Sequence, residues 1–153
     1  MSLRTVQEFF KENELPLSVI ETEKPTGTVS EAAKAFGILE DEIAKTMGFL
    51  LKDGSCILIL MKGTARVDNK KFKKVFHEKA KMIPFDEVEE LTGHEPGGVC
   101  PFGLANPLKI YLDETLKEFE IMYPAGGTPH SAVKVSVEML SKITNGTWVN
   151  ITK

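Results

Sequence analysis

The chain has 153 residues, of which 42% are hydrophobic and 27% charged, and its formal net charge is −3. This length predicts one domain over residues 1–153, and the composition is typical of a soluble globular protein. No apolar run approaches the roughly 20 residues that span a bilayer, and the overall acidity argues against wholesale coating of nucleic acid.

The amino terminus lacks the basic stretch and apolar core of a secretory signal. Only two cysteines occur, Cys56 and Cys100, which does not indicate a disulfide framework. We therefore expect a cytoplasmic protein.

The first part of the chain is predicted to alternate helices and strands. Val6, Phe9 and Phe10 share one face of an opening helix that Pro16 terminates. The next predicted elements, in chain order, are a strand over 17–22, a helix from Thr28 to about Gly37 with capping-box spacing to Glu31, and a short helix over 39–44.

A β-hairpin is the clearest local signal. Two apolar runs, 46–51 and 55–61, are joined by Lys52-Asp53-Gly54, and Asp-Gly favours a tight turn between paired strands.

The second part of the chain predicts the rest of a mixed fold. A basic helix begins near Asp68, and Ser136 caps a last helix that ends near Ile143. Between and after them we expect a helix over 86–91 and strands over 81–84, 108–112, 120–123, 132–135 and 147–151. This order predicts an α/β or α+β fold, with a mostly antiparallel curled sheet or barrel-like core and peripheral helices.

Two glycine-rich segments are candidate binding loops. Residues 93–103 contain four glycines and two prolines, which predicts a rigid loop whose free N–H groups can hold a carbonyl, an amine or a phosphate. Residues 124–129 form a second such turn, with His130 beside it. A plain connecting turn is the alternative for the first segment.

The segment 66–81 carries seven basic and two acidic side chains, a local charge of +5. Such a cluster can contact a phosphate backbone. It can equally be the solvated face of a helix, because Phe72, Val75 and Phe76 have the spacing of a core-facing stripe.

Several kinds of active site are disfavoured. The histidines at 77, 94 and 130 and the absence of a Cys-x-x-Cys pair argue against a metal site, and neither a Gly-x-Ser-x-Gly elbow nor a Walker loop is present. Cys100 with a histidine can form a nucleophile and base, although a small residue before a proline is more often structural. Lys45, at the head of an apolar strand, is by itself more often a solvated strand end.

Four motifs taken together favour a functional role over these structural alternatives. Their order along the chain is Lys45-Thr46 before the hairpin, Val67-Asp68 before a helix, Gly97-Gly98-Val99-Cys100-Pro101-Phe102-Gly103, and Gly126-Gly127 with His130. With them the chain resembles, from about Val19 to Ile151, the YbaK/ProX family of aminoacyl-tRNA deacylases, which is related to the editing domain of bacterial prolyl-tRNA synthetase.

The resemblance implies a YbaK-like fold and a deacylase that acts in trans, without a cofactor or metal, on mischarged aminoacyl-tRNA carrying a small amino acid. The implied catalytic residues are Lys45, Gly97, Gly98 and Pro101, with oxyanion donors in the 97–101 loop. From the backbone freedom of glycine we also expect a positive φ at Gly98. The implied substrate-binding residues are Thr46, Val99, Cys100, Phe102, Gly103, Gly126, Gly127 and His130. The basic segment adds tRNA contacts at Arg66, Lys70, Lys71, Lys73 and Lys74.

Other interpretations stay open. The expected partner is the acceptor end of aminoacyl-tRNA, an aminoacyl-tRNA synthetase is a further candidate, and neither DNA nor a membrane is expected. A non-catalytic adaptor that binds tRNA or a synthetase, and a small-molecule ester or amide hydrolase, are the alternatives. The residue after the lysine is asparagine in some subgroups of the family but Thr46 here, so the subgroup and the amino acid removed stay undetermined. The tRNA, the role of His130 and the oligomeric state are also undetermined.

Overall fold

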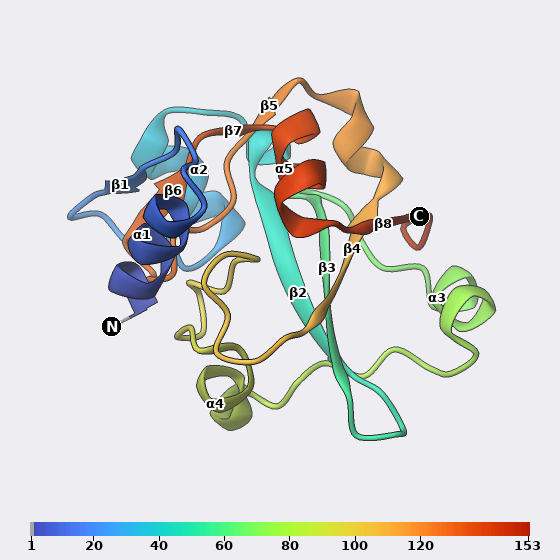
Figure 1. The fold of residues 1–153 in the computed structure, drawn as a ribbon. Helices are drawn as coiled ribbons and strands as arrows, with labels where there is room; N and C mark the ends of the chain where they lie inside the picture. Colours follow the sequence, from blue (N-terminus) through green and yellow to red (C-terminus); the bar gives the residue numbers. More distant parts are fainter. Residues whose placement is uncertain (1) are drawn as a thin grey trace.

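A four-stranded mixed sheet forms the centre of the protein in a computed structural model, which describes residues 2–153 (Figure 1). The strand order is β2-β3-β4-β8. β2 (Ala44–Leu50) and β3 (Cys56–Lys62) form the predicted antiparallel hairpin, while β4 (Lys109–Asp113) and β8 (Thr147–Val149) continue the sheet in parallel. Parallel pairing follows from the long crossover between β3 and β4, which contains two helices.

Two small antiparallel sheets flank this core. β1 (Val19–Glu21) pairs with β6 (Ser131–Val133), and β5 (Ile121–Met122) pairs with β7 (Val135–Ser136). Over residues 2–153 the strands therefore form three sheets and no closed barrel. The expected mixed α/β class is confirmed, whereas the barrel-like core is not found and two of the three pairings in the main sheet are parallel.

Five α-helices surround the sheets within the described residues. They are α1 (Ser2–Glu12), α2 (Val29–Phe36), α3 (Asn69–Phe76), α4 (Val88–Thr92) and α5 (Val137–Thr144). The predicted caps are in place: the Thr28 hydroxyl accepts the Glu31 N–H at 3.1 Å, and Asp68 and Ser136 cap α3 and α5 in the same way. Gly37 ends α2 in the left-handed region, with φ 65°.

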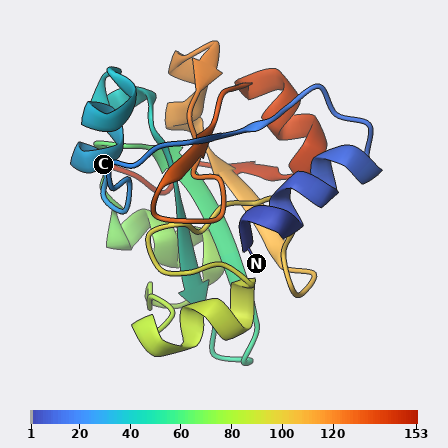
Figure 2. The ribbon, with the colours of Figure 1, turned by 90° about the vertical axis from the view of Figure 1, so that its left-hand side faces the viewer.

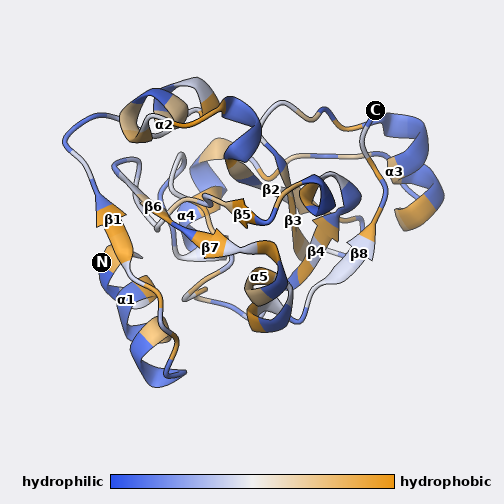
Figure 3. Cartoon of the chain, turned by 90° about the horizontal axis from the view of Figure 1, so that it is seen from above, coloured by the Kyte–Doolittle hydropathy of each residue, from blue (hydrophilic) through white to orange (hydrophobic). Residues whose placement is uncertain are grey.

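β3 is buried on both faces, which accounts for its unbroken apolar run. Leu58 and Leu60 belong to one core cluster, which α1 and α5 help to close. Ile57, Ile59 and Met61 belong to the other, beneath α3. Seen from above, hydrophobic residues gather on the central strands, and the helices carry much of the hydrophilic colour (Figure 3).

Three predicted elements differ in detail. Residues 39–44 form a 3-10 turn, Glu40–Glu42, because Ala44 already pairs within β2. Residues 81–84 are not a strand and reach the sheet through a single bridge between Met82 and Phe49. The predicted strand 132–135 is divided between β6 and β7. No helix in residues 2–153 is both long and apolar enough to cross a bilayer.

Candidate active site

The outer edge of β2 is open at Thr46. On one side of this position Ala44 donates its N–H to the Tyr123 carbonyl at 3.2 Å, and on the other Leu50 donates to the Lys81 carbonyl at 2.8 Å. Alternate residues of a strand point their N–H and C=O groups to the same edge, so Thr46 directs its backbone groups outward, as Ala44 and Leu50 do. No backbone partner outside the β2–β3 hairpin meets Thr46 anywhere in residues 2–153.

The amino-terminal end of α2 faces this edge. The N–H groups of Val29 and Ser30 have no acceptor within the part of the chain that the structure describes. Unpaired N–H groups in the first turn of a helix attract negative charge. Thr28 and Val29 line a pocket together with Thr46.

The two glycine-rich loops meet on the other side of the pocket. Gly97 has φ +88°, and a Cβ built there would lie 3.1 Å from the Cα of Gly27. Gly98 abuts the main chain of Thr128. Among described residues the amides of Gly97 and Val99 have no acceptor, whereas Gly98 donates its N–H to the Glu95 carbonyl at 2.9 Å.

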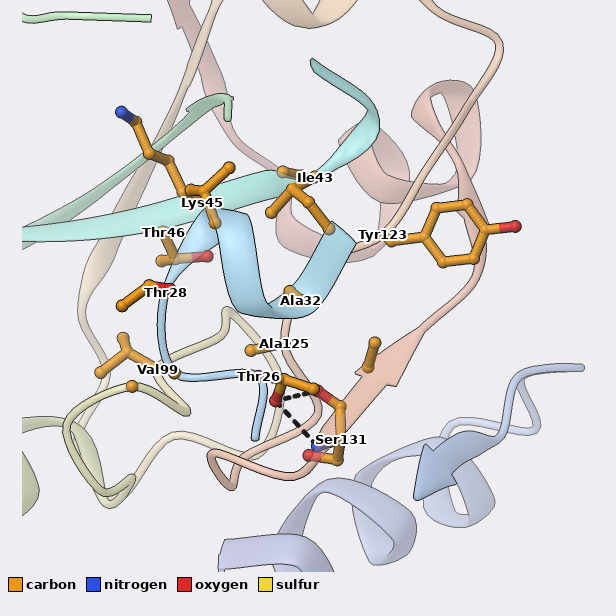
Figure 4. Close-up of a pocket in the computed structure, with 15 residues that line it drawn as sticks. Thr26, Thr28, Ala32, Ile43, Lys45, Thr46, Val99, Tyr123, Ala125 and Ser131 are labelled. Carbon is orange, nitrogen blue, oxygen red and sulfur yellow. Dashed lines mark hydrogen bonds between the residues drawn. The ribbon is translucent and has the colours of Figure 1, made fainter. Parts of the chain in front are cut away.

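These three elements enclose a pocket of about 190 Å³ (Figure 4). Its walls consist mainly of small or aliphatic residues with a few hydroxyl groups. The lining residues are Thr26, Gly27, Thr28, Val29, Ala32, Ile43, Ala44, Lys45, Thr46, Gly97, Val99, Tyr123, Ala125, Ser131 and Ala132. This volume is below the roughly 300 Å³ at which pockets for drug-sized ligands begin, so it suits a small group.

The polar groups of the pocket differ in how they are satisfied. The Thr26 hydroxyl donates to the Ser131 carbonyl at 3.3 Å and accepts the Ser131 N–H at 3.1 Å, so it ties two walls together. The Thr46 hydroxyl is buried and has no partner within residues 2–153. An unpaired buried hydroxyl is unfavourable in the free protein, which makes it available to a ligand.

Lys45 extends from β2 away from Thr26 and Ser131 (Figure 4). Its Nζ donates to the Ala65 carbonyl at 2.5 Å. Burial, and secondly the positive charge of Arg66, lower the pKa of Lys45 below its usual value of 10.5. The two positive charges of Lys45 and Arg66 therefore repel each other, and an anion bound between them would offset this repulsion.

Four of the predicted site residues line the pocket: Lys45, Thr46, Gly97 and Val99. The other predicted residues of the loops lie behind it or away from it. Cys100 and Phe102 are fully buried in the core, while Pro101 and Gly103 lie against α1. Gly126 packs on Val19, and Gly127 packs on Ser2. His130 is exposed, and its Nδ1 lies 3.1 Å from the Lys24 carbonyl.

The expectation of a positive φ at Gly98 is wrong. Its φ is not positive, because the left-handed residue is Gly97. Its N–H donates to the Glu95 carbonyl, and its lack of a side chain permits the contact with Thr128.

Burial keeps the Cys100 thiol neutral. Its Sγ lies 3.6 Å from the Nε2 of His94 and 3.6 Å from the Phe102 carbonyl. Complete burial raises the pKa of the Cys100 thiol to about 12. His94 bonds to the same carbonyl through Nε2 at 2.7 Å, and burial lowers the pKa of His94.

The basic segment does not form one surface over the pocket. Arg66 is close enough to Lys45 to lower its pKa, whereas α3 lies on the side of the main sheet away from α2 in Figure 1. Lys71 is bonded to the Thr152 carbonyl at 2.7 Å, and Lys70, Lys73 and Lys74 are exposed.

Much of the pocket was not predicted from the sequence. Thr28 was expected only as a helix cap, and no motif pointed to Thr26, Tyr123 or Ser131. The capping box of Thr28 begins directly after Gly27, and a helix cap next to a glycine is a signal that could have placed Thr28 at the site. No group of three or more metal-ligating side chains occurs among residues 2–153.

Comparison with known proteins gives one consistent family. The sequence model of the aminoacyl-tRNA editing domain matches residues 23–143. The chain is 40% identical over 154 residues to YwhH of Bacillus subtilis (strain 168), a protein described as uncharacterized, and the match covers 100% of this chain and 98% of YwhH. It is 24% identical over 126 residues to EbsC of Enterococcus faecalis, provisionally named a Cys-tRNA(Pro)/Cys-tRNA(Cys) deacylase. This match covers 82% of this chain and 77% of EbsC.

A solved structure agrees with these relatives. The crystal structure of a protein provisionally described as a trans-editing enzyme for prolyl-tRNA synthetase matches with a TM-score of 0.90 at 32% identity. The match covers 99% of this chain and 97% of that chain.

Proposed function

This chain belongs to the aminoacyl-tRNA editing domain family, and from that premise we propose that it hydrolyses the ester bond of mischarged aminoacyl-tRNA carrying a small amino acid. The observation that carries the proposal is the pocket at Thr46, where unpaired backbone N–H groups from three segments surround a space of about 190 Å³. Such a pocket holds an ester carbonyl without any enzyme nucleophile.

The chemistry needs a held carbonyl and a water molecule. Water adds to the ester carbon, the carbonyl oxygen becomes an oxyanion, and the bond to the ribose oxygen then breaks. The ribose oxygen takes up a proton, which leaves a free amino acid and a tRNA with its terminal hydroxyl restored. The free N–H groups of Val29, Gly97 and Val99 are the donors we assign to the oxyanion. Each such donor is worth about 3 kcal/mol in other oxyanion sites.

The size of the pocket supports a small amino acid. Its volume of about 190 Å³ limits the length of the side chain that it can hold, and Ala32, Ala44, Ala125 and Ala132 make part of its wall apolar. Editing of small amino acids is needed because one methylene distinguishes competitors by only about 1 to 3 kcal/mol in a synthetase active site. The relative EbsC is named for removal of cysteine, which is within this size class.

Lys45 is assigned to the nucleic acid side of the substrate. Lys45 lines the pocket, and the neighbouring Arg66 is close enough for its positive charge to lower the pKa of Lys45. We assign them to the phosphate of the terminal nucleotide, because an anion between them offsets both their repulsion and the burial of Lys45.

For the remaining basic residues we propose a narrower role, which is contact with the tRNA away from the ester. Lys70, Lys73 and Lys74 project from α3 into solvent, so they can meet phosphates farther from the ester. Lys71 is already bonded to the carboxyl-terminal segment and is the least available of the group.

The test is a panel of tRNAs charged with Ala, Ser, Cys, Thr and Pro, incubated with the protein in the presence of EDTA because no metal is expected to take part. We expect rapid release of at least one small amino acid and stable charging for the rest. Binding of the charged tRNAs without release of any of them would support the adaptor alternative and contradict the proposal.

A further inference from the structure

A second pocket of about 240 Å³ opens beside the candidate active site and shares Thr46, Gly97 and Val99 with it. Its remaining walls are mostly apolar. Two large side chains at its rim are unusually exposed, Phe85 at 79% and Met82 at 50%. An exposed aromatic ring next to a binding pocket is typical of a surface that contacts a ligand.

A third pocket continues along the same strand. Leu50 and Leu51, at the end of β2, line a basic hollow of about 640 Å³. Its charged residues are Lys52, Lys73, Lys79 and Lys81, with Glu78 as the single acidic side chain. All four lysines are exposed.

The three pockets follow one another along β2. Residues 44–46 line the first, 46–48 the second and 50–51 the third. Leu50, in the third pocket, lies four residues beyond Thr46, which at about 3.3 Å per residue is about 13 Å, a length that a few nucleotides of single strand can cover. The segment between α3 and α4 lies antiparallel to β2 here, because the Leu50 N–H donates to the Lys81 carbonyl and the Ile83 N–H donates to the Gly48 carbonyl. In Figure 2, α4 lies at the end of the molecule where the β2–β3 hairpin turns.

We propose that the unpaired 3′ end of the tRNA lies along β2, with its terminal base stacked on Phe85 and the preceding phosphates beside Lys52, Lys79 and Lys81. This inference rests on the proposed function, because it places the ester in the pocket at Thr46. An aromatic platform next to a basic groove is the combination that binds single-stranded RNA.

The charges around Phe85 set the direction of the strand. Four acidic side chains, at Asp86, Glu87, Glu89 and Glu90, are exposed on the turn and helix that follow it. They repel phosphate, so the backbone of the bound strand runs on the lysine side and only the uncharged base reaches Phe85. A protein partner that docks through apolar contacts does not need the lysines. The three pockets along β2, which combine an aromatic ring with lysines, therefore favour RNA.

The direct test is binding of a fluorescently labelled oligoribonucleotide ending in CCA, measured by anisotropy, which requires no turnover. We expect Phe85→Ala to weaken binding about tenfold and Phe85→Trp to restore it, because stacking depends on the ring. Leu39→Ala is the matched control, since Leu39 is 69% exposed and lines none of the three pockets. The triple change of Lys52, Lys79 and Lys81 to Gln should reduce the salt slope by about 2, at about 0.7 per phosphate. The same change at Lys109, Lys117 and Lys142 should leave the slope unchanged.

Kinetics separate this inference from the proposed function. Phe85→Ala should raise KM for aminoacyl-tRNA and leave hydrolysis of a minimal aminoacyl ethyl ester unchanged. Wild-type affinity for the oligoribonucleotide in Phe85→Ala, together with an unchanged KM, overturns the inference even when the protein is an active deacylase. If Phe85→Ala dissociates an oligomer and leaves the RNA affinity unaltered, Phe85 belongs to a protein interface, and the inference is also overturned.

Discussion

Gly98 and Thr128 bring the two glycine-rich loops into main-chain contact: a Cβ at Gly98 would lie 2.6 Å from the Cα of Thr128. Backbone on both sides leaves no flexible side chain to move. We therefore expect Gly98→Ala to lower the free energy of unfolding by about 1 to 3 kcal/mol and to distort the pocket wall. Gly27→Ala is the control, because its nearest neighbours lie 3.7 Å away. Urea denaturation of both variants measures the difference, and equal stabilities would show that the loop contact is not tight.

Thr46→Val should separate stability from activity. The valine keeps the shape of the side chain and removes a buried hydroxyl that has no partner within residues 2–153. Stability should rise by about 1 kcal/mol, while deacylation should fall if the hydroxyl contacts the substrate. Denaturation and turnover are measured on the same preparation. A variant that is less stable but fully active would assign the hydroxyl to an internal hydrogen bond instead.

Cys100→Ser should keep most of the activity. The thiol of Cys100 is fully buried and its pKa is raised to about 12, so it carries no thiolate at neutral pH. Mass spectrometry during turnover should find no aminoacyl group on the protein. A thioester trapped at Cys100 would contradict a mechanism in which water attacks directly.

His94 should make the protein less stable in acid. Its ring is fully buried, its Nε2 donates to the Phe102 carbonyl, and its Nδ1 has no partner among the described residues. Burial holds the folded pKa below 6.5, so the unfolded chain binds a proton first as the pH falls. The stabilisation is complete above pH 6.5 and is lost as the pH falls through the lower, folded pKa. In His94→Gln this dependence should largely disappear, as followed by thermal unfolding between pH 7.5 and pH 5. If the pH dependence of stability is unchanged in His94→Gln, it originates in another titratable group.

Local signals in the sequence identified much of the fold. The Asp-Gly turn gave the hairpin, and Thr28, Asp68 and Ser136 each cap the predicted helix. These features depend on residues a few positions apart. The parallel pairing of β3 with β4 depends on a crossover of two helices, so periodicity could not predict it.

The candidate site was predicted only where a motif pointed into the pocket. Lys45, Thr46, Gly97 and Val99 line it, but a glycine string does not reveal which glycine faces a ligand and which supports the other loop. Tyr123 and Ser131 reach the pocket because β5 and β6 pair with distant strands. That pairing is a property of the tertiary structure.

The most direct test of the account is the single-turnover rate of amino acid release from a mischarged tRNA by the wild type and by Lys45→Ala, with Lys34→Ala as a solvent-exposed control. The proposed role of Lys45 predicts a loss of about a hundredfold or more for Lys45→Ala at an unchanged melting temperature, and no loss for the control. Near-normal release by a folded Lys45→Ala variant would contradict it.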